Sequence, residues 1–334
     1  MKSLLSAVVV TLLVVVSTQP VVAAKPWFAP MVRIGRFRKA AMIRSLRLVP
    51  QHARGHHPST RAISEVLLLR GGGDNGNGNG CPVECSKLAV TSIAALLAGQ
   101  SLLAEWKPAM VARQHFSDFS PQGSFIVRVL TANVLTWVAW AVCLLLVGDS
   151  SSSTTTATAL TALGIVNTVD ALRTFAIGDI ERCQLDPAGQ YFMLITPLIA
   201  TYAGWTKASW GVLYLKLFMG AYILDGVVAA NQPSLTAKVF FGPNHTLSEN
   251  SLTILKNTGW WILAVGVSGM ALAFGVEPKM ALACGLGCAV VAGVDILART
   301  NQKKAPVLLW TIVDALAVLA MTMCNSNSVA PPSV

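Results

Sequence analysis

Charged residues are scarce in this chain, which excludes an ordinary soluble domain. Only 12% of the 334 residues are charged and 54% are hydrophobic, whereas roughly 25% charged residues are usual in soluble proteins. Acidic residues are absent from the first 64 positions, which contain ten lysines or arginines. The remaining 15 basic residues equal the 15 acidic ones, so the net charge of +10 belongs to that N-terminal segment. The composition predicts an integral membrane protein that partners the lipid bilayer, and it gives no reason to expect a nucleic acid partner.

Cysteine is also rare, and the sequence patterns of common catalytic sites are missing. Seven scattered cysteines are too few for a disulfide scaffold. Cys81 and Cys85 could pair in an oxidising compartment, but a metal site would need two further ligands and none lies nearby. The chain has no Gly-x-x-x-x-Gly-Lys-Ser/Thr loop, no His-Glu-x-x-His pattern and no Gly-x-Ser-x-Gly turn. We therefore expect no metal, no cofactor and no catalytic residues, and we predict that the protein is not an enzyme.

The N-terminal part of the chain has the features of targeting segments and a tether. Residues 1–24 contain one lysine, a short apolar run and a small-residue cleavage site, the pattern of a secretory signal peptide. Residues 25–64 form a basic presequence, which we expect to be disordered. Residues 65–85 form a linker rich in glycine and asparagine.

The sequence Phe28-Ala29-Pro30 follows the expected cleavage site and lies within the acid-free basic stretch. A signal peptide followed by such a stretch, with an aromatic residue before Ala-Pro, resembles the bipartite presequences of algae with secondary plastids. That family places the aromatic residue directly at the cut, whereas here residues 25–27 intervene. The resemblance implies an address and no function: the chain enters the secretory pathway, and its final membrane is endoplasmic reticulum-derived, secretory or plastid-associated.

Eight apolar stretches follow the linker, and each is close to or above the length that a transmembrane helix needs. They lie at residues 87–104, 125–147, 155–178, 190–206, 209–229, 252–275, 280–298 and 306–323. We expect an all-α integral membrane protein of about eight transmembrane helices. Four helices fall in residues 86–206 and four in residues 207–324, and a short tail at 325–334 ends the chain.

Matching residues recur at a nearly constant spacing, which predicts two repeats of four helices. The sequence Val-Asp-Ala-Leu at 169–172 returns 125 residues later as Val-Asp-Ile-Leu at 294–297. The other matches are Pro108, Ala112 and Phe116 with Pro233, Ala237 and Phe241 at the same spacing, and Asn133 and Trp137 with Asn257 and Trp261 at a spacing of 124. Four helices return the chain to the same side of the membrane, so we expect parallel repeats related by an axis along the membrane normal.

Carboxylates inside the apolar stretches are the candidate functional residues, because each costs roughly 2.5–3.5 kcal/mol on insertion scales. Asp170 and Asp295 occupy matching positions, and Asn167 lies one helical turn before Asp170. Asp225 and Asp314 are secondary candidates. Such acids can coordinate a cation, relay protons or hold a polar solute.

Ion pairing within one helix is the structural alternative for the two matching acids. Arg173 lies three residues after Asp170 and Arg299 four residues after Asp295, spacings that place acid and base on one helical face. Such pairs would fix the helices without any solute. For the other embedded bases we expect side chains that extend toward the membrane surface; they are Arg128, Lys216 and Lys256.

Small residues recur at every fourth position of the stretch 280–298. They are Ala281, Gly285, Ala289 and Gly293. A stripe of small residues lets a second helix approach closely, so we predict a helix-packing face here.

Two functions from different classes remain open. The first is a carrier of a small solute or ion, with Asp170 and Asp295 facing each other across the interface of the repeats. The second is a non-catalytic scaffold or assembly factor of an organelle or secretory-pathway membrane. A carrier should have its acids beside a cavity, and a scaffold should have each acid closed in an ion pair.

Overall fold

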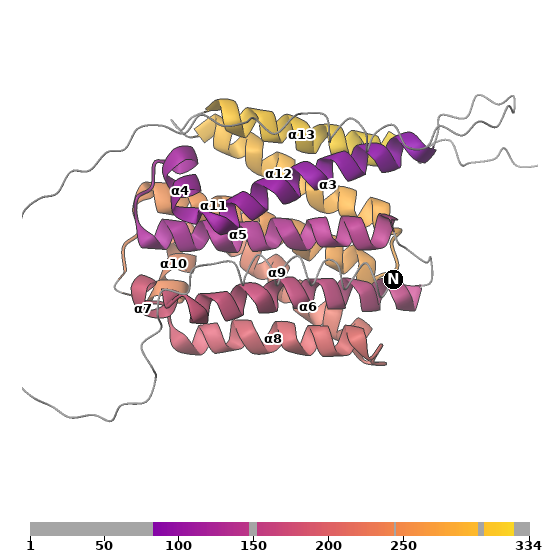
Figure 1. The fold of residues 1–334 in the computed structure, drawn as a ribbon, viewed down its shortest axis with the longest axis horizontal. Helices are drawn as coiled ribbons and strands as arrows, with labels where there is room; N and C mark the ends of the chain where they lie inside the picture. Colours follow the sequence, from indigo (N-terminus) through magenta and orange to yellow (C-terminus); the bar gives the residue numbers. More distant parts are fainter. Residues whose placement is uncertain (1–82, 147–151, 244, 300–303, 324–334) are drawn as a thin grey trace, which may run out of the picture. The chain divides into compact units, whose positions relative to one another are not determined.

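The computed structural model of this chain describes residues 83–146, 152–243, 245–299 and 304–323 (Figure 1). The predicted signal peptide, the basic presequence, nearly all of the linker and the C-terminal tail lie outside these residues. Every regular element in the described part is a helix, so the all-α prediction is confirmed.

Eight long helices lie in the described residues, and each overlaps one of the apolar stretches identified in the sequence. They are α3 (Val83–Trp106), α5 (Pro121–Trp140), α6 (Ser152–Ala176), α8 (Pro187–Trp205), α9 (Gly211–Asn231), α11 (Glu249–Ala273), α12 (Pro278–Arg299) and α13 (Lys304–Met323). The hydropathy pattern did not predict the three short helices α4 (Pro108–Phe116), α7 (Asp179–Cys183) and α10 (Pro233–Phe241), and it did not show that the end of the stretch 125–147 continues α5 as the π-helix η1 (Ala141–Leu146).

Three segments of the described chain form helices long and apolar enough to cross a membrane. They are Pro121–Leu145, Gly211–Asn231 and Pro278–Ala298. Two shorter apolar helices span Val90–Trp106 and Val307–Thr322. This part of the chain is therefore compatible with a membrane protein, while the count of eight spans stays a prediction.

Local signals in the sequence explain where several of the helices begin. Ser120 caps α5 by accepting a hydrogen bond from the Gly123 amide at 2.9 Å, and a proline follows at the first helical position. Ser248 caps α11 in the same way, accepting from the Ser251 amide at 3.0 Å. A side-chain acceptor at this position satisfies an amide that the helix leaves without a partner. These caps extend α5 and α11 by a few residues beyond their apolar stretches.

The short helices α4 and α10 share one local geometry. Each has nine residues and starts with a proline. The residues before them, Lys107 and Gln232, have φ and ψ of −130° and 61°, and of −131° and 61°. Both helices lie at the left end of the long helices in Figure 1. The two elements are therefore alike in length, in entry angle and in the end at which they lie.

The long helices pack in the same order in both halves of the chain. In the first half α5 packs against α3 and α6, and α6 packs against α8. In the second half α11 packs against α9 and α12, and α12 packs against α13. The two halves meet where α5 packs against α11.

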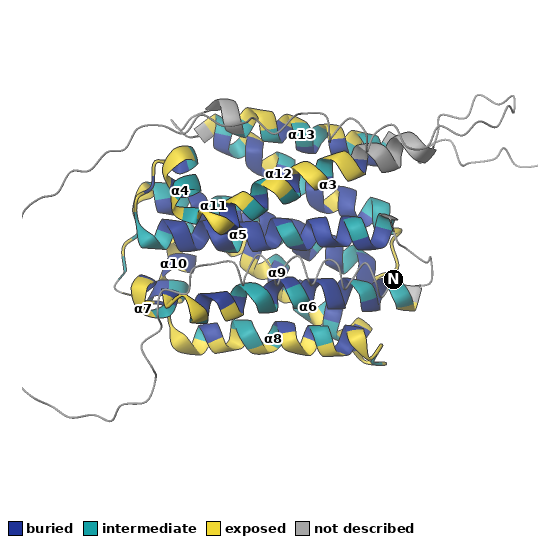
Figure 2. Cartoon of the chain, in the orientation of Figure 1, coloured by how far each residue is buried: buried dark blue, intermediate teal, exposed yellow. Residues whose placement is uncertain are grey.

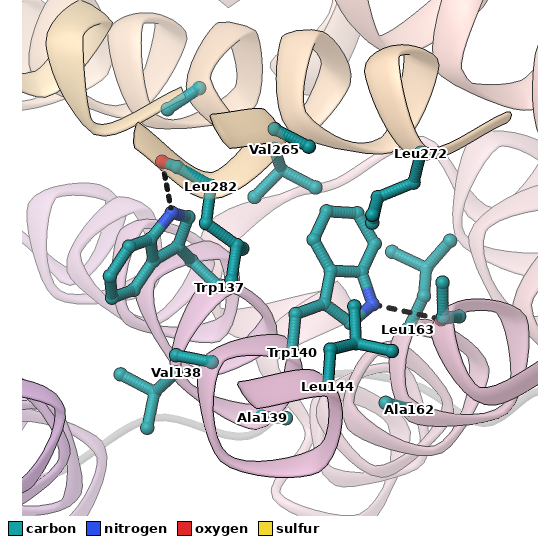
Figure 3. Close-up of a cluster of buried hydrophobic side chains, with 14 of the residues drawn as sticks. Trp137, Val138, Ala139, Trp140, Leu144, Ala162, Leu163, Val265, Leu272 and Leu282 are labelled. Carbon is teal, nitrogen blue, oxygen red and sulfur yellow. Dashed lines mark hydrogen bonds between the residues drawn. The ribbon is translucent and has the colours of Figure 1, made fainter. Parts of the chain in front are cut away.

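Two buried tryptophans of α5 lie in the core at this junction (Figure 3). Trp137 donates its indole N–H to the carbonyl of Leu282 in α12 at 3.2 Å. Trp140 donates to the carbonyl of Ala159 in α6 at 2.9 Å. Each ring therefore fills the core without leaving its polar atom unbonded, and the two bonds join α5 to both halves of the chain.

Apolar side chains also cover the outer faces of the described part. Figure 2 shows α5 buried along most of its length, whereas exposed residues run along α8. Large apolar residues are exposed on α8 and α9, among them Phe192, Tyr202, Leu213 and Leu224. An apolar surface this extensive is rare on soluble proteins, so these faces fit a lipid environment.

Candidate functional site

A cluster of buried charges lies where α5, α6 and α7 meet. Arg128 is only 1% exposed, and its Nη2 lies 2.8 Å from Oδ2 of Asp179. The same nitrogen donates a hydrogen bond to Oγ1 of Thr174 at 3.0 Å. Burial raises the pKa of the Asp179 carboxyl, although Arg128 beside it acts in the opposite direction. The expectation that Arg128 extends toward the membrane surface is wrong, because these partners hold the guanidinium inside the protein.

Arg173 pairs with Glu105 of α3, a residue that the sequence did not single out. Its Nη1 lies 2.5 Å from Oε2 of Glu105, and its Nη2 donates to the main-chain carbonyl of Glu105 at 2.5 Å. The hydroxyl of Thr131 in α5 donates to Oε1 of the same carboxylate at 2.5 Å. The predicted ion pair between Arg173 and Asp170 is therefore replaced by one between helices, because the long side chain of Arg173 reaches across to α3.

Asp170 lies beside this cluster but has no ion pair of its own among the contacts that the structure describes. It is half-buried, and its Oδ1 is buried without a hydrogen-bond partner. Arg128 and Arg173 both act on it electrostatically. Two basic side chains thus act on a carboxylate that has an oxygen without a hydrogen-bond partner among the described residues.

Asn167, one turn before Asp170, joins three helices by hydrogen bonds. Its amide donates to Oγ1 of Thr136 in α5 at 3.2 Å and to the carbonyl of Leu163 at 2.9 Å. Its oxygen accepts from the hydroxyl of Tyr222 in α9 at 3.0 Å. The described contacts of Asn167 satisfy both ends of its amide, which gives it a structural role.

The second half holds a simpler ion pair. Nζ of Lys256 in α11 lies 2.5 Å from Oδ2 of Asp295 in α12, with 24% and 14% of the two side chains exposed. Lys256 therefore points at an acid, contrary to the expectation that it extends toward the membrane surface. The side chain of Arg299, the predicted partner, lies outside what the structure describes. Asp170 and Asp295 thus belong to separate charge clusters, one in each half of the chain.

The two secondary acids have opposite surroundings. Asp225 is exposed on α9 between the exposed apolar residues Leu224 and Val227. Asp314 of α13 is only 5% exposed, and its Oδ1 has no hydrogen-bond partner among the residues that the structure describes. A buried carboxylate oxygen without a partner is costly, and a carboxylate on a face that fits lipid is costly as well.

Asp314 lines a cavity of about 130 Å³ between the two halves of the chain. The walls come from α3, α4 and α5 of the first half and from α11, α12 and α13 of the second. Most lining residues are apolar, and the principal polar ones are Gln100, Ser101, His115, Thr131, Asn257, Thr311 and Asp314. A mostly apolar hollow with a few convergent polar groups is the usual form of a small-molecule site.

The cavity adjoins both charge clusters without including their acids. Thr131 lines it and donates to Glu105, the partner of Arg173. On the other side, Asn257 and Ile296 line it, and these residues directly follow Lys256 and Asp295 in the chain. The two matching acids are thus not among the lining residues, and Asp314 is the carboxylate on the wall.

The stripe of small residues in α12 is buried along its length. Its members are Ala281, Gly285, Ala289 and Gly293. A side chain at Gly285 would collide with Ala264 and Ser268 of α11, and one at Gly293 would collide with Thr311 of α13. Ala289 and Gly293 also line the cavity. The small residues thus permit close packing against two neighbours and leave part of the hollow open.

Two residues of the first cluster, Glu105 and Asp179, were not predicted from the sequence. Glu105 lies one residue beyond the expected end of its apolar stretch, and Asp179 lies in a connection that was not expected to be helical. Arg128 was noticed only as an embedded base. The one available signal was that buried arginine in an apolar helix requires an acid somewhere in the fold. Within the described residues, no three His, Cys, Asp or Glu side chains are grouped so as to hold a metal ion.

Comparison of the chain with protein-family models, with curated proteins and with solved structures found no match.

Proposed function

We propose that this chain is a multi-spanning membrane carrier of a small solute or ion, and that the solute binds in the cavity between the two halves. The observation that supports this most is the buried Oδ1 of Asp314, which lines the cavity and has no hydrogen-bond partner. Acids kept inside membrane segments commonly mark solute or ion pathways. A bound solute would supply the missing partner.

The arrangement of the halves supports a carrier as well. The order of helix packing is the same in both halves, and α4 and α10 have nearly identical entry angles. In carriers built from repeats, the solute site lies at the interface of the repeats, and their relative motion exposes it to alternate sides. A cavity whose walls come from both halves has the required position.

This proposal changes the roles first expected of the two matching acids. Asp170 and Asp295 are not among the residues that line the cavity, and each lies near at least one basic side chain of its own half. In the proposal they hold the helices of each half in register, and Asp314 contacts the solute.

Electrophysiology on solid-supported membranes, which records the charge that a carrier moves across the membrane, tests the proposal. Proteoliposomes of the full chain would be exposed to sodium, potassium, methylammonium and glycine as probes. We expect a saturable signal from at least one probe, and we expect Asp314→Asn to remove it while Asp225→Asn, an exposed acid outside the cavity, leaves it unchanged. A signal that Asp314→Asn does not alter would reject the cavity as the site.

The scaffold function is the second candidate, and two ion pairs favour it. Glu105 with Arg173 joins α3 to α6, and Lys256 with Asp295 joins α11 to α12. Pairs that are closed in this way fix helices and need no solute. If Asp314→Asn and Asp295→Asn lower only the abundance of the protein in its membrane, with no probe moving charge in any variant, the scaffold is the better account.

A further inference from the structure

We propose that the ligand of the Asp314 cavity is a small organic ammonium ion, of the size of methylammonium or ethylammonium. This inference rests on the proposed carrier function and names the chemical class of its solute. It depends on the size, the charge and the wall chemistry of the cavity.

The size of the cavity limits the ligand to a few atoms. Its volume is about 130 Å³, and an engineered protein cavity of about 150 Å³ is large enough to bind benzene. The hollow therefore has room for a solute of only a few non-hydrogen atoms. Sugars, nucleotides and most amino acids are too large.

The charge of the wall favours a monovalent cation. Asp314 is the single carboxylate among the described lining residues, and no lysine or arginine is among them. An anion would meet Asp314 with no lysine or arginine on the wall to offset it. The amide and hydroxyl oxygens of Gln100, Ser101 and Asn257 can accept further N–H hydrogen bonds from a bound ammonium group.

The rest of the wall favours an organic cation over a metal ion. The indole rings of Trp261 and Trp310 and the ring of Phe116 line the cavity, together with aliphatic residues. Aromatic faces attract an ammonium ion, and apolar walls accommodate its methyl or ethyl group. A metal ion such as calcium takes six to eight oxygen ligands, whereas most residues of this wall are apolar.

Binding of radiolabelled methylammonium to the purified full chain in lipid nanodiscs tests the inference. We expect saturable binding that unlabelled ethylammonium displaces and that potassium, sodium and the larger tetraethylammonium ion do not. Asp314→Asn should weaken binding at least about thirtyfold, because it removes the only counter-charge. The matched control Asp225→Asn should leave the affinity unchanged.

A second variant keeps the test decisive if Asp314→Asn does not fold. Trp310→Leu preserves the carboxylate and removes one aromatic face, so it should weaken binding about three- to thirtyfold. Displacement by potassium or sodium at concentrations equal to those of ethylammonium would overturn the inference in favour of a metal ion. Equal displacement by tetraethylammonium would show that the label binds outside the cavity.

A negative result in the transport test and a negative result in the binding test lead to different conclusions. Asp314-dependent binding of methylammonium without charge movement would retain the ammonium site and reject the carrier. Asp314-dependent charge movement with another probe, in the absence of methylammonium binding, would retain the carrier and reject the ammonium class.

Discussion

Each half of the chain has a basic residue that forms an ion pair with an acid later in the sequence. The two pairs differ in their burial and in their further contacts. In the first half Arg128 is 1% exposed and meets Asp179 and Thr174. In the second half Lys256 meets Asp295 as a single pair that is partly exposed. Arg128 makes both contacts through Nη2, and its Nε and Nη1 are buried without a hydrogen-bond partner among the described residues.

The position of each base follows from the cap of its helix. Arg128 and Lys256 are each the eighth residue after a capping serine, Ser120 and Ser248. The two bases differ in the number of hydrogen bonds that their charged groups can donate. A guanidinium has five donors in a planar fork and can join several elements, whereas an ammonium is a compact charge that suits a single acid. The comparison teaches that bases at the same distance from a helix cap can have several contacts in one half and a single ion pair in the other.

Removal of the buried base should have the largest effect on stability. Arg128→Met leaves the buried carboxylate of Asp179 without its partner, and we expect a loss of about 3–5 kcal/mol in the free energy of unfolding. Titration with sodium dodecyl sulfate, followed by circular dichroism, measures it. Arg128→Lys should lie between the wild type and the methionine variant. A loss below about 1 kcal/mol for Arg128→Met would make the first cluster no stronger than an exposed pair.

Disruption of the close packing between α6 and α8 should have the next largest effect on stability. A side chain at Gly164 would meet the amide of Thr201 at 2.5 Å and the carbonyl of Pro197 at 2.6 Å in α8. We therefore expect Gly164→Leu to cost about 1–3 kcal/mol or more in the same titration.

Two control positions sharpen that comparison. Gly99 of α3 faces open space, so Gly99→Leu should leave stability nearly unchanged. Ala289 of α12 lies 125 residues after Gly164 and borders the cavity, so Ala289→Leu should cost less than Gly164→Leu. Equal costs at Gly164 and Gly99 would contradict the close approach of α6 and α8.

Loss of the second base should have the smallest effect. Lys256→Met removes a pair that is 24% and 14% exposed, and we expect a cost of at most about 1 kcal/mol. The exchanged variant Lys256→Asp with Asp295→Lys should recover most of this loss, because it restores opposite charges. A cost as large as that of Arg128→Met would remove the distinction between a network and a pair.

The sequence predicted the helices better than it predicted the partners of the charges. Local hydropathy located Asp170, Asp295 and Asp314 inside helices, because a helix forms its backbone hydrogen bonds within itself. The pair of Arg173 with Glu105 joins residues 68 positions apart. It depends on how α3 packs beside α6, and no local pattern encodes that.

The candidate site, too, was predicted only in part from the sequence. The sequence treated Asp314 as secondary because it has no match at the repeat spacing, while Asp170 and Asp295 do. The structure gives Asp314 a buried oxygen on a cavity wall and places the matched acids near bases. The predicted repeat spacing therefore pointed to acids that lie near bases, and the structure pointed to the acid that lines a cavity.

By itself the sequence determined that the described chain is helical and apolar, where its helices lie and which of them carry charge. These properties depend on neighbours within a few residues. The tertiary structure alone decided which acid meets which base, and which carboxylate is left facing a hollow. Those outcomes depend on helices distant in sequence coming into contact, and in a low-dielectric interior the distances between their side chains determine how each charge is satisfied.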